Sequence, residues 1–268
     1  KQRITLLPGV PTLFNAIVNA PHLQAEWFTS LRYGISGGAP LPPEVKEKFE
    51  KLTQSRLMEG YGLTEMRPVV CCNPRHKPSK TASAGLPFPG TVISIRNPEK
   101  PKAKPLGTGK VGEIWVTGPQ LMQGYWNNPK ASKECMVKEG PTTWLRTGDL
   151  GFLDADGYLH ITDRMKDIIL VNGYNVYPRV IEDALYTHPD VAEVMVIGLP
   201  DAKKGEAPHA YVVLKNGAKA TADDLFSYAR KHLNPLERPV QVVLRQHLPK
   251  TQVGKPSKKD LRAEILGR

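Results

Sequence analysis

The chain has 268 residues, of which 40% are hydrophobic and 24% charged, as expected for a globular protein of one or two domains. It contains no run of about 18 consecutive apolar residues, so the sequence predicts no transmembrane helix. The start at Lys1 lacks both an initiator methionine and a signal-peptide pattern, and we therefore expect the chain to begin inside a longer protein. The formal net charge of +11 suggests nucleic acid, anionic lipid or a phosphate-rich substrate as a partner, although a solvated basic surface explains it as well.

Residues 1–84 alternate short apolar runs with helical patterns, which is the rhythm of a doubly wound α/β sheet. The residues that carry this prediction are Ile4–Leu7 and Leu31–Ser36 as strands, and Pro11–Val18 and Pro42–Phe49 as helices. Gly37 and Gly38 follow directly after the second predicted strand. Because ligands of such sheets bind at the carboxyl ends of strands, these glycines mark a candidate site.

From Gly85 to His160 the pattern changes to short β runs separated by Gly and Pro turns, such as Thr91–Ile95 and Gly112–Val116. This predicts a small β-barrel or sheet subdomain. The stretch Asp154 to Tyr158 contains Asp-Gly and predicts a hairpin turn, whereas the ligand spacing of a calcium loop is absent.

The remaining residues predict a compact α+β unit of about 100 residues, a normal domain size. Its predicted strands are Asp167–Val171, Val191–Gly198 and His209–Leu214, and its predicted helices are Pro178–Thr187 and Thr221–Leu233. The three cysteines, Cys71, Cys72 and Cys135, form no disulfide framework and indicate reduced thiols of a cytosolic protein. The seven histidines are scattered and give no metal-ligand spacing.

Five short clusters could carry chemistry, each with a plainer explanation. Gly37-Gly38-Ala39-Pro40 allows close approach of a flat ring, and is equally a tight turn. Glu59 to Glu65 offers an aromatic ring, a hydroxyl and a carboxylate within seven residues, or else a glycine turn with solvated neighbours. Trp144 to Gly151 flanks Asp149 with glycines, which suits capture of a ribose diol or a strand-end turn.

The other two clusters lie near the C-terminus. Asp163 to Asp167, followed by Gly173 to Pro178, resembles a charged linker and a loop. Leu248 to Lys255 ends in Gly-Lys, which can bring a cation into a site, although a lone surface lysine is common.

In this order and at these separations the clusters resemble the adenylate-forming superfamily of acyl-CoA synthetases, luciferases and peptide-synthetase adenylation domains. The motifs are Tyr-Gly-Leu-Thr-Glu from Tyr61, Arg-Thr-Gly-Asp from Arg146, Asp-Arg-Met-Lys-Asp from Asp163 and Pro-Lys-Thr-Gln-Val-Gly-Lys from Pro249. The resemblance covers essentially the whole chain, and is to the C-terminal portion of a bacterial medium- or long-chain fatty acyl-CoA synthetase.

The resemblance implies an order of domains. Residues 1–84 would be the C-terminal part of a large α/β nucleotide- and acyl-binding domain, 85–165 its β-barrel or β-rich subdomain, and 166–268 a mobile α+β lid. It implies two half-reactions, in which a carboxylate and ATP give acyl-AMP and pyrophosphate, and CoA then gives acyl-CoA and AMP. ATP/AMP, Mg²⁺ and coenzyme A are the implied cofactors.

The resemblance also implies residue roles. The adenine would lie between Gly38, Ala39 and Pro40 on one face and Tyr61 on the other, with Glu59 and Gly60 at the ring edge and Gly62 elsewhere in the nucleotide site. Asp149 would bind the ribose hydroxyls with Ile161 packing nearby, and Arg164 would reach the ribose or phosphate. Thr64 would bind the α-phosphate and Glu65 would hold Mg²⁺. Lys166 would be the hinge, and Gly173 and Tyr174 would bind CoA. Lys255 would bridge the attacking carboxylate and the α-phosphate, which makes it, with Thr64 and Glu65, the implied catalytic set.

The glycine-rich loop with which this superfamily cradles the β- and γ-phosphates is absent from the sequence. We therefore expect the chain alone to be inactive. A ligase for an aryl or short-chain acid, and a non-catalytic AMP- or CoA-binding fragment, remain alternatives. Nucleic-acid binding rests on net charge alone and is not expected. We expect a cytoplasmic protein with at most peripheral association with the inner membrane, and the sequence does not indicate an oligomeric state.

Overall fold

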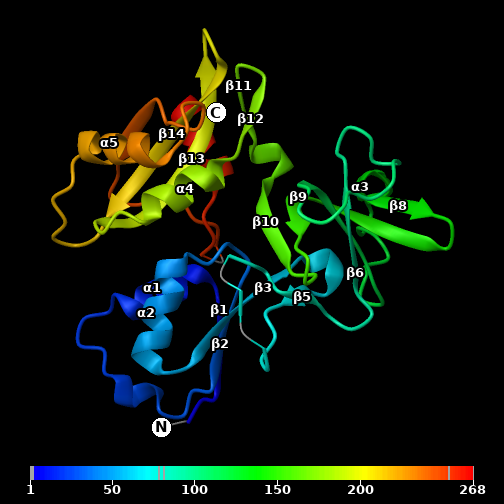
Figure 1. The fold of residues 1–268 in the computed structure, drawn as a ribbon, viewed down its shortest axis with the longest axis horizontal. Coiled ribbons are helices and arrows are strands. Elements are labelled where there is room, and N and C mark those ends of the chain that lie inside the picture. The colour runs from blue at the N-terminus through cyan, green and yellow to red at the C-terminus, as the bar shows by residue number, and fades with distance from the viewer. Residues whose placement is uncertain (1–2, 78, 81, 253, 268) are drawn as a thin grey trace. The chain divides into compact units, whose positions relative to one another are not determined.

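The computed structural model describes residues 3–77, 79–80, 82–252 and 254–267 (Figure 1). The chain divides into two compact units, Lys1–Thr162 and Asp163–Arg268. The first unit contains two five-stranded sheets and the second contains one. No helix within the described ranges is long and apolar enough to cross a bilayer.

The first sheet has the strand order β1-β2-β3-β4-β5. Its strands are β1 (Leu6–Gly9), β2 (Tyr33–Gly37), β3 (Arg56–Gly62), β4 (Val69–Cys72) and β5 (Leu86–Pro87). The first three strands are parallel, and β4 and β5 continue the sheet antiparallel. Parallel pairing brings the carboxyl ends of β2 and β3 to the same edge, with Gly37 opposite Gly60.

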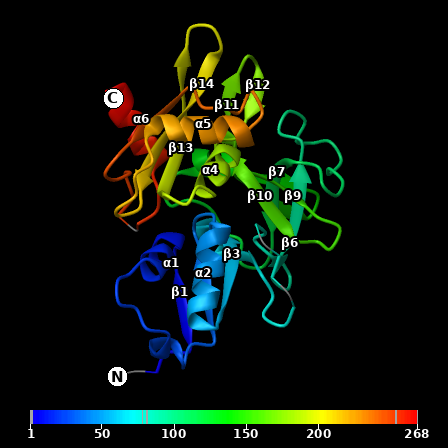
Figure 2. The same cartoon turned by 60° about the vertical axis from the view of Figure 1, so that its left-hand side comes forward.

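The helices α1 (Pro11–Val18) and α2 (Pro43–Thr53) pack side by side against this sheet, as Figure 2 shows. Both helices begin with proline in the first turn, where the missing N–H costs nothing. Phe14 and Phe49 are fully buried between them in an edge-to-face pair, with ring centroids 5.1 Å apart. The 3₁₀ turns η1 (Ala25–Phe28) and η2 (Thr64–Met66) complete this part.

The second sheet contains β6 (Val92–Arg96), β7 (Gly112–Thr117), β8 (Met136–Glu139), β9 (Thr142–Leu153) and β10 (Leu159–Arg164). Of the two predicted forms, the sheet is confirmed and the β-barrel is wrong, because the strand order β10-β9-β7-β6 leaves β10 and β6 unpaired with each other among the described residues. The fifth strand, β8, pairs only with β9, so it cannot close the gap. The β-rich part is an open sheet, and its apolar face is buried with Met66 and Val70 of the first sheet's turn and strand.

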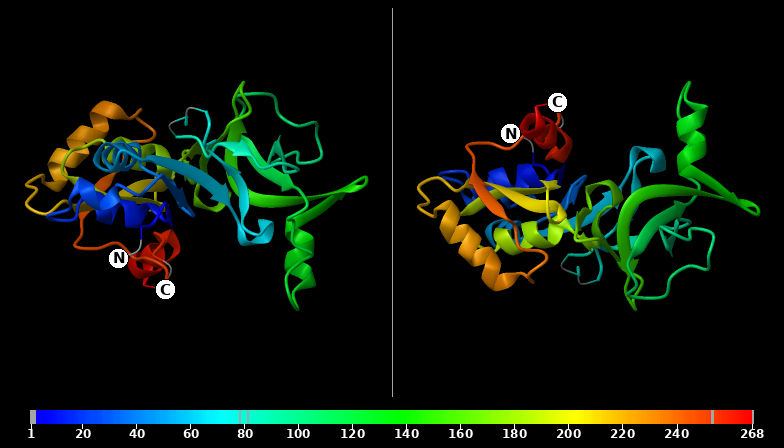
Figure 3. Two further views of the ribbon diagram at one scale, coloured as in Figure 1. Left: turned by 90° about the horizontal axis from the view of Figure 1, so that it is seen from below. Right: turned by 90° about the horizontal axis from the view of Figure 1, so that it is seen from above.

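One helix was not expected in this region. The short α3 (Pro129–Cys135) projects from the β-rich part, where Figure 3 draws it in green, and it buries none of its side chains. Asn128 caps it by accepting from Ala131 N at 3.0 Å, and Pro129 occupies its first turn.

The second unit is an α+β layer. Its elements are η3 (Met165–Asp167), β11 (Ile169–Val171), β12 (Tyr174–Val176), α4 (Pro178–Tyr186), β13 (Val191–Asp201), β14 (Gly205–Leu214), α5 (Ala222–His232), β15 (Gln241–Leu244) and α6 (Lys258–Leu266). The strands pair in the order β12-β11-β14-β13, with β15 on β14. Alternate residues of β13 face opposite sides, so Val196 packs in the core under α4 and α5, and Ile197 packs in the core with Leu261 of α6.

Candidate functional site: the carboxyl ends of β2, β3 and the Asp149 strand

Small residues form the edge where β2 and β3 end. Gly37 and Gly60 lie opposite each other, and a methyl group added at Gly60 would come within 3.3 Å of the Cys71 carbonyl oxygen. Gly38 has φ +83°, a left-handed conformation that favours glycine. The next turn is held in place because Leu41 N donates to Glu59 Oε1 at 3.2 Å. The predicted Gly38, Ala39, Pro40, Glu59 and Gly60 therefore lie together at one edge.

Gly62 is the tightest position on this edge. A methyl group there would lie 1.8 Å from the Pro68 carbonyl oxygen, so only glycine fits. The close approach lets the chain leave β3 and enter the turn η2, which carries Thr64 and Glu65. Met66, the last residue of that turn, is fully buried and fixes the turn on the core. Thr64 is exposed and Glu65 is half-buried, so both are accessible to a ligand.

Tyr61 and Asp149 are brought together although 88 residues separate them in the sequence. The Tyr61 hydroxyl donates to Asp149 Oδ2 at 2.6 Å, and Asp149 is only 4% exposed. Burial, followed by the Asp149 carboxylate, raises the pKa of Tyr61 well above its ordinary value, so the phenol stays protonated. Asp149 N donates to Thr147 Oγ1 at 3.1 Å, which fixes the backbone of the Arg-Thr-Gly-Asp segment of β9. The predicted Ile161 packs, partly buried, against the same apolar core as Tyr61.

Glu113 is a residue that the sequence reasoning missed. It is 2% exposed in β7, accepts from Trp115 Nε1 at 2.9 Å, and forms an ion pair with Arg146 Nη2 at 3.0 Å. Arg146 lies in β9, the strand that also carries Asp149, so Glu113 anchors this part of β9 from the neighbouring strand β7. A buried glutamate in a strand of apolar residues was the available signal, because such a charge needs a partner.

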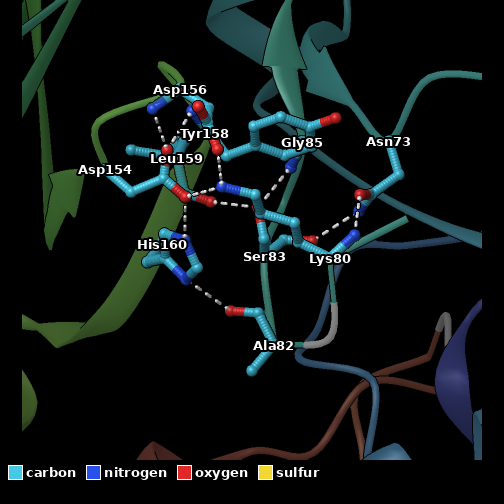
Figure 4. A network of polar contacts seen from close by, with 10 residues as sticks. All are labelled: Asn73, Lys80, Ala82, Ser83, Gly85, Asp154, Asp156, Tyr158, Leu159 and His160. Carbon is cyan, nitrogen blue, oxygen red and sulfur yellow. Dashed lines mark hydrogen bonds and ion pairs between the residues drawn. The ribbon is translucent and has the colours of Figure 1, made fainter. Parts of the chain in front are cut away.

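A second missed feature fastens the segment between β4 and β5 to the β9–β10 hairpin (Figure 4). Lys80 Nζ lies 2.6 Å from both Asp154 Oδ2 and Asp156 Oδ2, and His160 Nε2 lies 3.1 Å from Asp154 Oδ2. At the start of this segment Asn73 N donates to the Glu59 carbonyl oxygen at 2.9 Å. The network thus supports the segment that lies against the end of β3.

The predicted hairpin turn is confirmed by the same region. Asp154 N donates to the Tyr158 carbonyl oxygen at 3.0 Å, and Gly157 N donates to that of Asp154 at 3.0 Å.

No cluster of three metal-ligating side chains exists in the part of the chain that the structure describes.

The other predicted site residues belong to the second unit. Arg164 and Lys166 are exposed, and Lys166 lies in the turn η3 close to the start of that unit. Gly173, with φ +79°, makes the turn of the β11–β12 hairpin, and the next residue, Tyr174, is 64% exposed. Asn172, with φ +52°, is the other turn residue, and positive φ at both central residues is typical of a tight two-residue hairpin.

Lys255 lies in a closed turn between β15 and α6. Thr251 N donates to the Lys255 carbonyl oxygen at 2.8 Å, and Lys250 and Pro256 form an antiparallel bridge. Lys250 Nζ pairs with Glu193 Oε1 at 2.6 Å. Val253 of this motif lies outside the described residues.

A buried ion pair holds α6, which follows the Lys255 turn directly. Lys258 Nζ lies 2.9 Å from Glu182 Oε1 of α4, and both side chains are less than one fifth exposed. Glu182 Oε1 also accepts from Val196 N of β13 at 2.8 Å. Three elements therefore meet at this pair, and the Lys255 turn is attached to their common core.

Comparison with known proteins agrees with this geometry. The family described as "AMP-binding enzyme" matches residues 1–126, and the "AMP-binding enzyme C-terminal domain" matches residues 180–255. A long-chain-fatty-acid–CoA ligase of Bacillus subtilis (strain 168) is 44% identical over 95% of the chain, and one of Salmonella typhimurium is 43% identical over 100%. The alignments cover 44% and 46% of those two proteins, so the chain spans about half the length of the curated relatives it matches.

The solved structures agree as well. ATP-bound MatB from Rhodopseudomonas palustris superimposes with a TM-score of 0.91 and 33% identity, over 98% of this chain and 51% of that chain. A benzoate CoA ligase from Burkholderia xenovorans LB400 gives a TM-score of 0.86 and 29% identity, over 98% of this chain and 52% of that one. With its two matching domains and an adenylate-forming enzyme fold, the chain belongs to the AMP-binding enzyme family.

Proposed function

We propose that the protein is an AMP-forming acid–CoA ligase acting on fatty acids, with residues 1–84 and 85–165 forming the nucleotide-binding part and 166–268 the mobile lid. The observation that carries this proposal is the meeting of separate motifs at one sheet edge. Gly37 lies opposite Gly60, and the next residue of β3, Tyr61, contacts Asp149. The names of the two long-chain ligase relatives support fatty acids as substrates.

The nucleotide would lie on this edge. Gly38, Ala39 and Pro40 would contact one face of the adenine, because their small side chains allow close approach. Tyr61 would contact the other face. The Asp149 carboxylate, which accepts from the Tyr61 hydroxyl at 2.6 Å, would accept hydrogen bonds from the ribose hydroxyls.

The α-phosphate would lie beside the turn η2. Thr64 would donate its hydroxyl, and Glu65 would act as a ligand of Mg²⁺. The donor set fits this ion, since Mg²⁺ commonly takes one or two carboxylates and completes its shell with phosphate oxygens and water. Mg²⁺ bound there would offset the negative charge of the phosphates.

In the first half-reaction a carboxylate oxygen attacks the α-phosphorus, and the bond to pyrophosphate breaks. Lys255 would stabilise the charge that develops between the attacking carboxylate and the α-phosphate. In the second half-reaction the CoA sulfur attacks the acyl carbon and AMP leaves. The Gly173–Tyr174 turn would bind CoA, Arg164 would contact the ribose, and Lys166 would be the hinge between the two states.

The test separates the half-reactions in the intact protein. Lys255→Ala should slow pyrophosphate release from ATP and a fatty acid by roughly 10²–10³-fold, equivalent to about 3–4 kcal/mol. It should largely preserve acyl-CoA formation from pre-made acyl-adenylate. Lys259→Ala, on the exposed side of the adjacent helix, is the matched control. Equal loss in both half-reactions would contradict the role of Lys255.

A ligase for aryl acids is the second candidate, because feruloyl-CoA synthase of an Amycolatopsis species is 36% identical over 98% of this chain. Comparing kcat/KM for octanoate, palmitate and an aryl carboxylate decides between them. Calorimetry with AMP and CoA on the 268-residue chain tests binding apart from turnover.

We further propose a cytoplasmic location with peripheral membrane association through basic surface, which flotation with anionic vesicles would test.

A further inference from the structure

The backbone of Glu65 is fixed on both sides. Met66 is fully buried in the apolar core, and its N–H donates to the Leu63 carbonyl oxygen at 2.9 Å. The Glu65 carbonyl oxygen accepts from Met122 N at 2.8 Å. The main chain therefore leaves only the side-chain torsions of Glu65 free to vary.

The Tyr125 phenol restricts those torsions. Its hydroxyl donates to Glu65 Oε1 at 2.6 Å, across a sequence separation of 60 residues. This length is typical of a charge-assisted O–H···O⁻ hydrogen bond, which is about twice as strong as a neutral one.

Tyr125 is itself held by the start of α3. Its N–H donates to Ser132 Oγ at 2.8 Å, and Ser132 Oγ donates to the Asn128 carbonyl oxygen at 2.9 Å. Asn128 in turn caps the helix through Ala131 N. A capped helix thus fixes the phenol, and the phenol fixes one oxygen of the carboxylate.

We propose that Tyr125 is a positioning residue that occupies Oε1 of Glu65 and thereby presents Oε2 as the single oxygen offered to the divalent cation on the nucleotide phosphates. The inference rests on the proposed function. A carboxylate held in advance loses little conformational freedom when it binds, and hydrogen-bond partners of metal ligands typically contribute 10–100-fold in metal affinity. Without the phenol, the side chain of the half-buried Glu65 would lose this restraint on its torsions.

The test is Tyr125→Phe in the intact protein, which removes one hydroxyl and keeps the ring. Mn²⁺ binding in the presence of ATP, followed by water-proton relaxation, reports metal affinity without turnover. We expect the affinity to fall by about tenfold. The Mg²⁺ concentration needed for half-maximal pyrophosphate release should rise by the same factor, with the KM for the fatty acid unchanged.

Two further variants separate positioning from general damage. In a Glu65→Gln background, Tyr125→Phe should cause no additional loss, because the carboxylate on which it acts is gone. Ser132→Ala, which loosens the Tyr125 backbone and leaves the phenol intact, should weaken Mn²⁺ binding to a smaller extent. Tyr228→Phe is the matched control, since its hydroxyl contacts only Thr187 Oγ1 at 2.8 Å among the described residues, and should change nothing.

The role of Tyr125 would be overturned if Tyr125→Phe left the Mn²⁺ affinity unchanged. It would also be overturned if Tyr125→Phe lowered that affinity as much in the Glu65→Gln background as in the wild type. Either result would leave the proposed function standing. A wild type that binds neither ATP nor Mn²⁺ would overturn the proposed function, and the role of Tyr125 with it.

Discussion

Removing the positive charge of Lys258 should destabilise the second unit strongly. Lys258→Met keeps the length of the side chain and leaves the Glu182 carboxylate in its buried place between α4 and β13. In the wild type, burial alone would lower the pKa of Lys258, but the carboxylates of Glu182, Asp163 and Asp167 outweigh it and raise that pKa. The ammonium is therefore charged at neutral pH.

The cost follows from the geometry of the pair. The Nζ–Oε1 distance is 2.9 Å, and the two side chains are 19% and 15% exposed, so solvent screens the interaction little. Breaking such a pair by removing one partner costs about 3–5 kcal/mol. For a domain of this size that corresponds to a fall in the unfolding midpoint of roughly 12–20 °C.

The pH dependence has a definite sign. Burial already raises the pKa of Glu182 in the wild type, and without Lys258 it should rise further. A group with a raised folded-state pKa contributes stability below its unfolded pKa and loses it as pH rises through the folded value. The free energy of unfolding that Lys258→Met loses relative to the wild type should therefore increase from about pH 4 towards neutral pH.

Thermal unfolding by circular dichroism, together with hydrogen exchange of the Val196 amide, measures the effect where the pair lies. Lys259→Met is the control, because Lys259 is exposed on the same helix. This substitution should change the free energy of unfolding by no more than about 0.5 kcal/mol. The double variant Glu182→Leu with Lys258→Met should be more stable than Lys258→Met, since the Glu182 carboxylate is no longer buried without its partner, whereas the buried Asp163 remains. A double variant as unstable as the single one would refute the reasoning.

Three further changes test the first unit. Gly62→Ala should lower the free energy of unfolding by more than about 3 kcal/mol, because its methyl group has no space, whereas Gly107→Ala has open space and should be tolerated in the same urea titration. Glu113→Gln should cost about 2 kcal/mol in that titration and weaken AMP binding by calorimetry, and full retention of both would contradict its anchoring role. The Lys80 ammonium lowers the pKa of Asp154, so the stability that the pair contributes is present at neutral pH and lost below about pH 4. Acid unfolding of Asp154→Asn should accordingly depend less on pH than that of the wild type.

Local chemistry made the helices predictable. Pro178 in the first turn of α4 and the capping box between Thr221 and Asp224 at the start of α5 act over four residues, so the sequence shows them directly. The predicted helices at Pro11–Val18 and after Pro42 are confirmed for the same reason. Gly37 and Gly38, after the predicted strand Leu31–Ser36, predicted a site at the carboxyl end of that strand, whereas the neighbouring strand β3 was not predicted.

The features that were missed depend on distant pairing. An open sheet and a barrel share the same alternating strands, and only the pairing of β10 and β6 distinguishes them. The contact of Tyr125 with Glu65 leaves no trace near either residue. Helix α3 was missed for a different reason, because Asn128 and Pro129 gave a start signal that the surrounding turns obscured.

The contacts that assemble the candidate site are those of great sequence separation, with 88 residues between Tyr61 and Asp149, 60 between Glu65 and Tyr125, and 74 between Lys80 and Asp154. Closing such long loops lowers the entropy of the chain, and this cost is offset only when many contacts form together. These hydrogen bonds should therefore form late in folding. During synthesis from the N-terminus, a nascent chain has β2 and β3 long before it has Asp149. Under the proposed function, β9 must therefore be synthesised before the edge of the first sheet can bind a nucleotide, and binding should appear in one step, not gradually, as the chain lengthens.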